Sequence, residues 1–535
     1  MPGGAMVSGM KRRFNTAGPC IEGMHYMIPP ARRLPEAPGL VEQLGYFVVH
    51  APRQTGKTTA LRALAQRLTG SGRYAAVLLS CEAGSVAGDD YEAAERIVVS
   101  RIRGEADSSL PAELRPPPVA DAPAGDRLYT ELKAWARACP RPVVLVFDEI
   151  DALRGKSLLT VLHQLRAGFP GRPGEFPSSV ILCGLRDVRD YKAASGGDPT
   201  RLGTASPFNI KLKSLRMGDF TPDEVRELYA QHTADTGQVL QEEAIGRALE
   251  LTAGQPWLVN ALANEIVEEM AVPAEQPITR AHVEQAKERL ILARATHLDS
   301  LVAKLHEPRV KRVLEPMLAG TVDGMSDTYD DDVSYVRDLG LAAQGKPLRI
   351  ANPIYREVLV RVLAARAEDS VMVEPRSFVL PDGRLDLGRI LREFAAFWVE
   401  HGDVLAAGLP YHEVAPQLVL MAFLQRVVNG GGFIDREYGI GRGRIDLLVR
   451  WPYCDAGGKP AWQREALELK VWRDKAKDPL GQGLMQMDGY LDRVGLDTGV
   501  LVIFDRRSAA GEIEARTRFE EAVSPGGRRV TVLRG

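Results

Sequence analysis

The segment Tyr46–Thr59 constrains the fold of this chain most, because it joins an apolar run to a short loop and then to a helix-periodic stretch. The apolar residues 46–49 predict a buried strand. Beyond the loop, the apolar residues between positions 60 and 68 recur at helical spacing. The segment therefore predicts a strand, a loop and a helix in direct succession.

The loop matches the phosphate-binding pattern G-x-x-x-x-G-K-[ST] everywhere except its first position, which is Ala51. In such loops, backbone N–H groups and the positive end of the helix dipole converge on phosphate oxygens. We expect Lys57 to contact the β- and γ-phosphates of ATP, and Thr58 to bind Mg²⁺. A surface Gly-Lys turn is the alternative, and the flanking strand and helix argue against it. The expected nucleotide contacts of the loop are Pro52, Arg53, Gln54, Thr55, Gly56, Lys57, Thr58 and Thr59.

The overall numbers indicate an ordinary globular protein of 535 residues, with about three or four domains. A net charge of -2 implies no whole-chain attraction to nucleic acid or anionic membranes, so any nucleic-acid surface must be local. The five cysteines form no C-x-x-C pair, which favours reduced thiols. The sequence shows no secretory signal and no apolar run of about 18 residues, so we expect a cytoplasmic protein without a membrane partner.

Residues 142–151 form a second chemical stretch, an apolar run that ends in acidic residues. A wholly apolar run predicts a buried parallel strand, whose carboxyl end carries side chains to a ligand crevice. We expect Asp148 to hold the Mg²⁺ of the nucleotide and Glu149 to polarise the attacking water. Acidic residues after a strand are also common in turns. The presence of Lys57 upstream favours the catalytic interpretation.

A third apolar run, residues 178–185, leads into Arg186 and Arg189. Arginines at this position can sense the γ-phosphate or act on a neighbouring subunit of a homo-oligomer. A solvated helix start with ion pairs is an equally good interpretation. Earlier in the chain, residues 104–126 are rich in Pro, Ala and acidic residues, which favours an exposed insertion.

The pattern becomes helical from Thr221 onward. Helices are predicted over residues 223–233 and 242–252, and a third begins at Pro256 after Gly254. These helices predict an all-helical lid over the nucleotide. The irregular residues 15–30 could pack near the nucleotide base or form a plain N-terminal arm.

Residues from about Asn15 to Glu268 resemble the AAA-like branch of P-loop ATPases that merges into the signal-transducing STAND group. The resemblance rests on residues 51–59, 146–151, 184–190 and 254–260. It implies an α/β sandwich with a helical lid, in which Gly254 and Pro256 lie near the nucleotide and couple its state to domain movement. Ala51 departs from the family pattern, and no Asn or Thr stands out as a polar sensor after the third strand. Both departures bear on hydrolysis more than on binding.

The residue pattern in the middle of the chain predicts a helix over residues 309–318, a second helix over 329–339, a β-wing over 340–351 and a third helix over 352–363. This order resembles the winged helix that follows the lid in many of these ATPases. Its second helix and the approach to it carry carboxylates that would repel phosphate, which favours a structural relay over a DNA reader. These carboxylates are Asp327, Asp330, Asp331, Asp332 and Asp338.

After a linker, the C-terminal part alternates helices and strands. Asp446, Glu468 and Lys470 lie on predicted strands, and the last two share one strand face because they are two residues apart. Two acids that hold Mg²⁺, beside a lysine that orients or deprotonates water, are what metal-assisted phosphodiester hydrolysis needs. A solvent-facing charged strand face is the alternative. Predicted helices cover 385–402, 412–428 and 479–493, and predicted strands cover 433–438, 444–450, 465–471 and 499–504.

Gln486 and Tyr490 lie four residues apart on one face of the last predicted helix. With them, the order Asp, Glu-x-Lys, Gln-x-x-x-Tyr resembles the PD-(D/E)XK nuclease superfamily, especially its RecB-like branch, over residues 385–533. The resemblance implies catalytic roles for Lys470, Gln486 and Tyr490, and Mg²⁺ ligation by Asp446 and Glu468. It also implies an acid from the first helix, for which Glu413 is the candidate and Glu437 a rival, and phosphate contacts by Arg442 and Arg444. An inactive, structural version of the fold is the alternative.

Together, these patterns predict an α/β multidomain protein with a P-loop parallel-sheet sandwich, a helical lid, a winged helix and a C-terminal α/β restriction-endonuclease-like domain. We expect an ATP-binding switch or motor that controls a Mg²⁺-dependent nuclease acting on DNA. The alternative is a STAND-like signalling or scaffold ATPase whose C-terminal domain binds nucleic acid or protein without cutting. The predicted boundaries are 1–217, 218–300, 301–366, 367–384 (linker) and 385–535.

Overall fold

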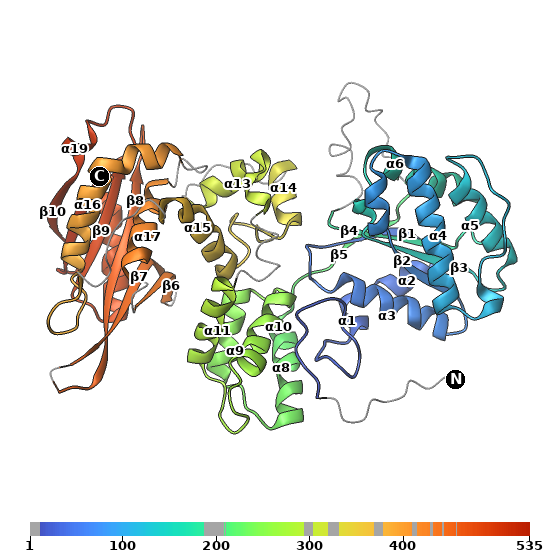
Figure 1. Cartoon of the computed structure of the whole chain (residues 1–535), viewed down its shortest axis with the longest axis horizontal. Helices are drawn as coiled ribbons and strands as arrows, with labels where there is room; N and C mark the ends of the chain where they lie inside the picture. Colours follow the sequence, from blue (N-terminus) through green and yellow to red (C-terminus); the bar gives the residue numbers. More distant parts are fainter. Residues whose placement is uncertain are drawn as a thin grey trace. The chain divides into compact units, whose positions relative to one another are not determined.

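The computed structural model describes residues 11–186, 208, 210–293, 303–318, 331–368, 378–408, 415–428, 432–440, 443–455 and 457–535. The chain divides into two compact units, each with its own β-sheet (Figure 1). The first unit comprises Met1–His297, Tyr329–Pro347 and Ala351–Ile354. The second comprises Leu298–Thr328, Leu348–Ile350 and Tyr355–Gly535.

The sheet of the first unit has five strands in the order β2-β3-β4-β1-β5, and every neighbouring pair is parallel. The apolar runs around residues 46, 75, 143 and 179 form the buried strands that the sequence predicts. The edge strand β5 was not predicted, because only one of its four residues, Leu215, is apolar. The strands are β1 (Tyr46–His50), β2 (Ala75–Ser80), β3 (Val143–Asp148), β4 (Ser179–Gly184) and β5 (Lys213–Arg216).

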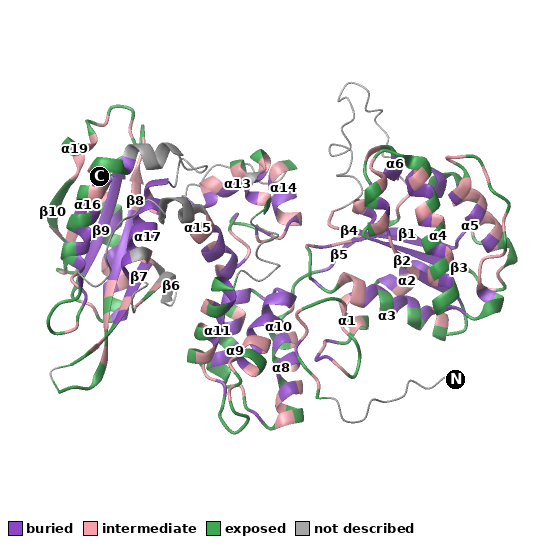
Figure 2. Ribbon diagram, viewed as in Figure 1, coloured by how far each residue is buried: buried purple, intermediate pink, exposed green. Residues whose placement is uncertain are grey.

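Helices cover both faces of this sheet, because successive strand residues point to opposite sides. On one face, Phe47 and Ile181 share a core with Leu61 of α3. On the other, Val48 packs in a core with Trp135 of α5. Figure 2 shows the strands between these layers as buried, which gives the predicted α/β sandwich. The helices are α1 (Pro30–Arg33), α2 (Ala37–Glu42), α3 (Lys57–Gly70), α4 (Tyr91–Ser109), α5 (Arg127–Ala138) and α6 (Gly155–Gly168).

The predicted exposed insertion over residues 104–126 is wrong in its first part. Helix α4 continues to Ser109, and Ala106, Leu110 and Leu114 are buried in the core beneath α4 and α5. Trp135 Nε1 donates to the carbonyl of Leu114 at 2.8 Å. Apolar side chains at four-residue spacing therefore outweigh the Pro-rich, acidic composition, and only residues 115–126 form an irregular, largely accessible segment.

The predicted helices after Thr221 are confirmed. Helix α8 begins with a capping box between Thr221 and Glu224. Before α10, Gly254 has φ of +79°, and a Cβ there would lie 2.1 Å from the carbonyl oxygen of Phe220, so this position requires glycine. The elements are α8 (Pro222–Thr236), α9 (Glu242–Thr252), α10 (Pro256–Asn264), the π-helix η7 (Glu265–Glu269) and α11 (Arg280–Leu292).

The residues of the predicted winged helix are divided between the two units. Helix α14 (Asp331–Asp338) belongs to the first unit, and α13 (Pro308–Leu318) lies in the second, as does nearly all of α15 (Pro353–Glu368). Residues 340–351, which are all described, form no continuous strand; Ala342 and Ile350 are single β-bridge residues, so the expected β-wing is not confirmed. One backbone hydrogen bond, from Ala351 N to Leu341 O at 2.9 Å, joins the ends of this stretch. Pro347 has no N–H group to donate to a strand ladder.

The sheet of the second unit is mixed and has six strands in the order β10-β11-β9-β8-β7-β6. Strand β7 is antiparallel to β6 and β8, β9 is parallel to β8 and β11, and β10 is antiparallel to β11. The four predicted strands are present, but the last two were not predicted. The strands are β6 (Phe433–Ile440), β7 (Gly443–Cys454), β8 (Pro460–Trp472), β9 (Thr498–Asp505), β10 (Arg518–Val523) and β11 (Arg529–Arg534).

Helices also cover both faces of the second sheet. Met487 and Leu491 of α18 pack in a core with Leu501 and Ile503 of β9. The ring of Phe504, on the opposite face, lies 5.1 Å from Trp398 of α16. The helices are α16 (Leu387–Gly408), α17 (Ala415–Val428), α18 (Leu480–Val494) and α19 (Ile513–Arg516).

Candidate functional site

The phosphate loop connects β1 to α3. Gln54 and Gly56 have φ of +58° and +89°, a left-handed backbone that turns the chain into the helix. This turn leaves the first N–H groups of α3 at the loop, which is the arrangement that binds phosphate. Ala51 is buried, and its N–H lies 3.4 Å from the carbonyl of Gly184. Its φ is not positive, so alanine fits at the position where the pattern has glycine.

Lys57, the first residue of α3, lies over the loop. Its Nζ donates to the carbonyl oxygens of Ala51 and Pro52, both at 2.8 Å. Desolvation lowers the pKa of Lys57, and the nearby carboxylates of Asp148 and Asp151 oppose that shift. The ammonium group is therefore fixed beside the loop, where a triphosphate would give it anionic partners.

Thr58 and Asp148 meet although they lie ninety residues apart in the chain. Thr58 Oγ1 donates to Asp148 Oδ2 at 2.6 Å. The other oxygen, Oδ1, accepts from the N–H of Glu149 at 3.0 Å. Asp148 is 2% exposed at the end of β3. A buried carboxylate beside a threonine hydroxyl and a phosphate loop fits Mg²⁺, which takes oxygen ligands.

Glu149 lies at the same edge of the sheet and has a left-handed φ of +54°. Its Oε2 accepts a hydrogen bond from Ser80 Oγ at 2.7 Å. Ser80 is the last residue of β2, and it pairs in register with Asp148. Sequence reasoning missed Ser80. The signal that could have found it is its place at the end of an apolar run, since parallel strands end at a common edge.

Arg186 follows β4 and contacts α14. Its guanidinium carbon lies 3.7 Å from the ring centroid of Tyr335. Arg189, the other arginine that the sequence singled out, lies outside the described residues. Two further contacts place the same segment against the loop and β5. A Cβ on Gly340 would lie 2.8 Å from Cβ of Pro52, and Arg216 Nη2 donates to the carbonyl of Arg337 at 3.2 Å.

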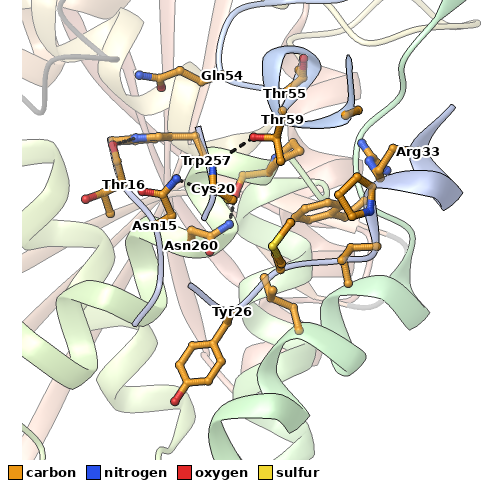
Figure 3. Close-up of a pocket in the computed structure, with 18 of the residues that line it drawn as sticks. Asn15, Thr16, Cys20, Tyr26, Arg33, Gln54, Thr55, Thr59, Trp257 and Asn260 are labelled. Atoms are coloured by element: carbon orange, nitrogen blue, oxygen red, sulfur yellow. Dashed lines mark hydrogen bonds between the residues drawn. The ribbon is translucent and has the colours of Figure 1, made fainter. Parts of the chain in front are cut away.

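A cavity of about 120 Å³ lies beside the loop (Figure 3). The N-terminal arm forms one wall, since Cys20 N donates to Thr59 Oγ1 at 3.0 Å and the carbonyl of Thr16 accepts from Trp257 Nε1 at 2.8 Å. Of the two interpretations of residues 15–30, packing near a nucleotide is therefore the one that the geometry favours. Pro256 lines the cavity, and Gly254 positions Phe220 there by accepting its N–H at 2.8 Å.

The second unit brings Asp446 and Glu468 together on neighbouring strands. Leu447 pairs with Leu467 in the β7–β8 ladder, so the same register places Asp446 opposite Glu468. Asp446 Oδ2 accepts from the N–H of Leu469 at 2.8 Å. Lys470 Nζ donates to Glu468 Oε1 at 2.7 Å.

The surroundings of Glu468 suit a cation. Glu468 is 2% exposed, and burial raises the pKa of its carboxyl group to about 7. The charge of Asp446 also raises this pKa, and the charge of Lys470 opposes the rise. Glu468 Oε2 has no hydrogen-bond partner among the described residues. A buried, unpartnered carboxylate oxygen beside a second carboxylate fits a divalent ion. The described residues contain no cluster of three or more acidic, His or Cys ligands, so this set consists of two acids.

Ala466 packs in the core that α18 forms against the sheet. Glu468 is two residues farther along β8 and points to the same side of the sheet, so α18 covers the face on which Glu468 lies. Gln486 Oε1 is buried and has no partner within the described part of the chain. Tyr490 packs against the α18 core. Glu413 and Arg442 lie outside the described residues, as do the side chains of Glu437 and Arg444.

One family model matches part of the first unit. Residues 42–191 match the family model described as AAA domain. No match to a curated protein was found. A Walker-type ATPase of Pyrococcus abyssi is 13% identical, with 65% of this chain and 99% of that chain covered and a TM-score of 0.46. The RuvB Holliday junction branch migration motor of Thermotoga maritima is 13% identical, with 61% and 92% covered and a TM-score of 0.33.

The family match and the loop geometry agree, so the first unit contains an AAA-type P-loop ATPase domain. Nucleotide binding follows from that assignment, and Mg²⁺ is the usual companion of the nucleotide. None of the described helices combines the length and apolar composition that crossing a lipid bilayer requires.

Proposed function

We propose that this protein is an ATP-binding switch or motor that controls a Mg²⁺-dependent nuclease acting on DNA. The observation that carries the nuclease half is the convergence of Asp446, Glu468 and Lys470 on two adjacent strands. These three side chains supply two carboxylates and one ammonium group on adjacent strands, and one carboxylate oxygen is buried and unpartnered in the described structure. An arrangement of this kind needs a divalent cation and suits phosphodiester hydrolysis.

In the ATPase half, the loop N–H groups and Lys57 bind the phosphates, while Thr58 and Asp148 would hold Mg²⁺. Bound Mg²⁺ neutralises charge on the β- and γ-phosphates. Glu149 orients the attacking water and accepts its proton. Ser80 fixes the Glu149 carboxylate through its 2.7 Å hydrogen bond.

In the nuclease half, Asp446 and Glu468 would hold Mg²⁺, which stabilises charge on the scissile phosphate. Lys470 orients the attacking water and offsets negative charge that develops on phosphate oxygens. Its hydrogen bond to Glu468 fixes the ammonium group at the edge of the acid pair. Gln486 and Tyr490 are proposed to contact substrate from α18.

Residues 331–347 are proposed to couple the two halves. They contact the phosphate loop at Pro52 and the end of β4 at Arg186, and both ends of this segment continue into the second unit. A loop that changes shape when ATP binds would shift these contacts, and the covalent connections would transmit the change. The contacts of this segment with Pro52 and Arg186 support a nucleotide-dependent switch.

A DNA-cleavage assay tests the proposal. The protein is incubated with plasmid and single-stranded DNA in Mg²⁺ or Mn²⁺, with and without ATP, next to the variant Lys470→Ala. We expect cleavage by the wild type and loss of cleavage in this variant. Lys477→Ala, which removes an exposed lysine of the same unit, is the matched control and should cleave normally.

Equal cleavage by the wild type and Lys470→Ala would contradict the nuclease assignment. If the wild type binds ATP and cuts no DNA under any of these conditions, the alternative gains support. In that case the protein is a STAND-like signalling or scaffold ATPase whose C-terminal unit binds a partner without cutting.

A further inference from the structure

Two large aromatic side chains are exposed at the projecting end of the β7–β8 hairpin (Figure 1). The pairing of β9 with β8 begins at Leu467, so residues 460–466 of β8 extend beyond it and pair with β7. Phe433 of β6 is 46% exposed, and Trp462 of β8 is 51% exposed. Neighbouring exposed rings form a contiguous apolar surface, which is the kind of surface that marks an interaction site.

Two arginines accompany the rings. Arg450 of β7 pairs in register with Phe433 of β6 and with Arg464 of β8. Its guanidinium carbon lies 5.6 Å from the ring centroid of Phe433 and 5.8 Å from that of Trp462. The centroids of the two rings are 5.8 Å apart. Residues that pair directly share a face of the sheet, and Trp462 is two residues from Arg464, so the four lie on one face. We call these four residues the hairpin patch.

The hairpin patch lies on the same side of the sheet as the acid pair of Asp446 and Glu468. Trp462 and Glu468 are an even number of residues apart on β8, so strand alternation points both side chains to one side. At about 3.3 Å per residue, the two positions are separated by about 20 Å along the strand. A nucleic-acid strand advances about 3.4 Å per stacked nucleotide, so about six nucleotides span this distance. One short strand could therefore reach both the acid pair and the patch.

The chemistry of the hairpin patch fits unpaired nucleotides. Aromatic rings bind single strands by stacking on bases, and every base has a π-face that can stack. Guanidinium groups bind phosphate, and the side chain of Arg464 is exposed beside Trp462. In a duplex, by contrast, neighbouring bases cover each base face, and extruding a base costs energy. Exposed rings next to arginines therefore favour a single strand over a duplex.

We propose that the hairpin patch binds single-stranded DNA, with Phe433 and Trp462 stacking on bases and Arg464 contacting phosphate. The inference rests on the proposed function for the choice of DNA as the ligand, and it deepens that function by naming the form of DNA that the second unit selects. A second copy of this chain is the competing occupant of an exposed apolar surface. The two arginines of the patch favour an anionic ligand over such a copy.

Fluorescence anisotropy of labelled DNA tests the proposal with the whole chain in EDTA, which removes Mg²⁺ and prevents cleavage. The probes are an oligothymidylate of about 20 nucleotides, longer than the span from the patch to the acid pair, and a duplex of equal length. Trp462→Ala should weaken binding of the single strand roughly 5- to 150-fold, the range expected for one lost stack of a base on a ring. Duplex affinity should change little. Trp462→Phe keeps a ring and should keep most of the single-strand affinity.

Three further variants make the result specific. Phe519→Ala removes a ring of β10 that is 41% exposed and lies outside the patch, and it should bind the single strand normally. Arg464→Gln should weaken single-strand binding and also reduce its salt dependence, by about 0.7 in the slope of log affinity against log salt for one lost phosphate contact. Arg529→Gln removes an exposed arginine of β11 and is the matched control for charge, so it should leave affinity and slope unchanged.

Equal single-strand affinity in the wild type, Trp462→Ala and Arg464→Gln would overturn the inference. A loss of equal size for the duplex in Trp462→Ala would also overturn it, because the rings would then not distinguish the two forms of DNA. If Trp462→Ala changes the mass of the protein in solution and leaves DNA affinity unchanged, the patch is a contact between copies of the chain and the inference fails.

The same variants separate this inference from the proposed nuclease. If the wild type binds the single strand through the patch and cuts no DNA in Mg²⁺, the inference stands and the nuclease assignment fails. If Trp462→Ala binds and cuts single-stranded DNA as the wild type does, the inference fails and the nuclease assignment stands.

Discussion

The two proposed sites differ in which atoms form them. The phosphate site is made largely of main-chain N–H groups from one short loop and the first turn of α3, with Lys57 and Asp148 added. The acid site of the second unit is made of side chains from two strands, and Leu469 contributes one main-chain N–H. A site made of backbone tolerates a substitution such as Ala51, whereas a site made of three side chains depends on each one.

The buried carboxylates of the two sites also differ. Asp148 and Glu468 are each 2% exposed. Asp148 accepts one hydrogen bond on each oxygen, from Thr58 and from the Glu149 N–H. Glu468 has one unpartnered oxygen in the described structure and faces Asp446, which together with burial raises its pKa. Both oxygens of Asp148 therefore have hydrogen-bond donors within the protein, whereas a bound cation would give the unpartnered oxygen of Glu468 a partner and stabilise the folded state.

The largest expected effect concerns Glu149, the side chain that distinguishes hydrolysis from binding at the phosphate site. Glu149→Gln should reduce ATP hydrolysis by about 10²- to 10⁴-fold, the typical contribution of a general base, and leave ATP affinity nearly unchanged. Phosphate release and nucleotide titration measure the two quantities. Glu82→Gln, an exposed change nearby, is the control. Undiminished hydrolysis in Glu149→Gln would show that another group activates water.

Lys57→Ala should weaken ATP binding by roughly 10- to 150-fold, because it removes charge-assisted hydrogen bonds to the phosphates. Titration of a fluorescent nucleotide measures the loss. Lys156→Ala removes an exposed lysine from the same unit and should bind normally. Equal affinities in Lys57→Ala and the control would remove Lys57 from the site.

Glu468→Gln should stabilise the protein in metal-free buffer. The pKa of Glu468 is about 7 in the folded chain against an ordinary 4.5, so the folded protein binds more protons than the unfolded chain between these values. Stability therefore falls as pH rises through this window, and the variant should exceed the wild type most above pH 7 and least below pH 4.5. Thermal unfolding should show a Tm difference of a few degrees, which corresponds to about 1 kcal/mol or more.

Mg²⁺ should raise the Tm of the wild type and have little effect on Glu468→Gln, because only a bound ion stabilises the folded state. Glu465→Gln is the matched control, since burial also raises the pKa of Glu465 on the same strand, away from Asp446. This control should keep the Mg²⁺ response. A Mg²⁺ response of equal size in Glu468→Gln would place the ion elsewhere.

The smallest expected effect is that of Ala51→Gly, which restores the first glycine of the loop pattern. Because Ala51 has no left-handed backbone, we expect ATP affinity to change less than about twofold, well below the effect expected of a lost hydrogen bond. A large gain in affinity would show that the alanine side chain obstructs the phosphates, and the contrast between a tolerant backbone site and a sensitive side-chain site would weaken.

Much of the first site could be predicted from sequence because its parts are local. The loop and its flanking strand and helix lie within Tyr46–Thr59, and β3 is an unbroken apolar run that ends in Asp148. The partner of Glu149 was missed because Ser80 comes from a different strand, and only the parallel pairing of β2 and β3 brings them together.

Three strands were not predicted, and two of them, β5 and β10, lie at sheet edges. Strand β5 has the short sequence Lys-Ser-Leu-Arg, and β10 has three charged residues among six, so neither shows an apolar run. The end of α4 was assigned to an exposed insertion because it lies in a Pro-rich, acidic context, although Ala106 faces the core. The β-wing was expected over residues 340–351, where the structure has single β-bridge residues at Ala342 and Ile350 and no continuous strand.

Control of the acid site by the phosphate site is the central claim, and the rate of DNA cleavage with and without ATP tests it most directly. Coupling energies between distant sites typically correspond to about 5- to 150-fold, so ATP should change the wild-type cleavage rate by a factor in that range. Lys57→Ala should cleave at the ATP-free rate whether or not ATP is present. A wild type that binds ATP and cuts DNA at the same rate in both conditions would contradict the account.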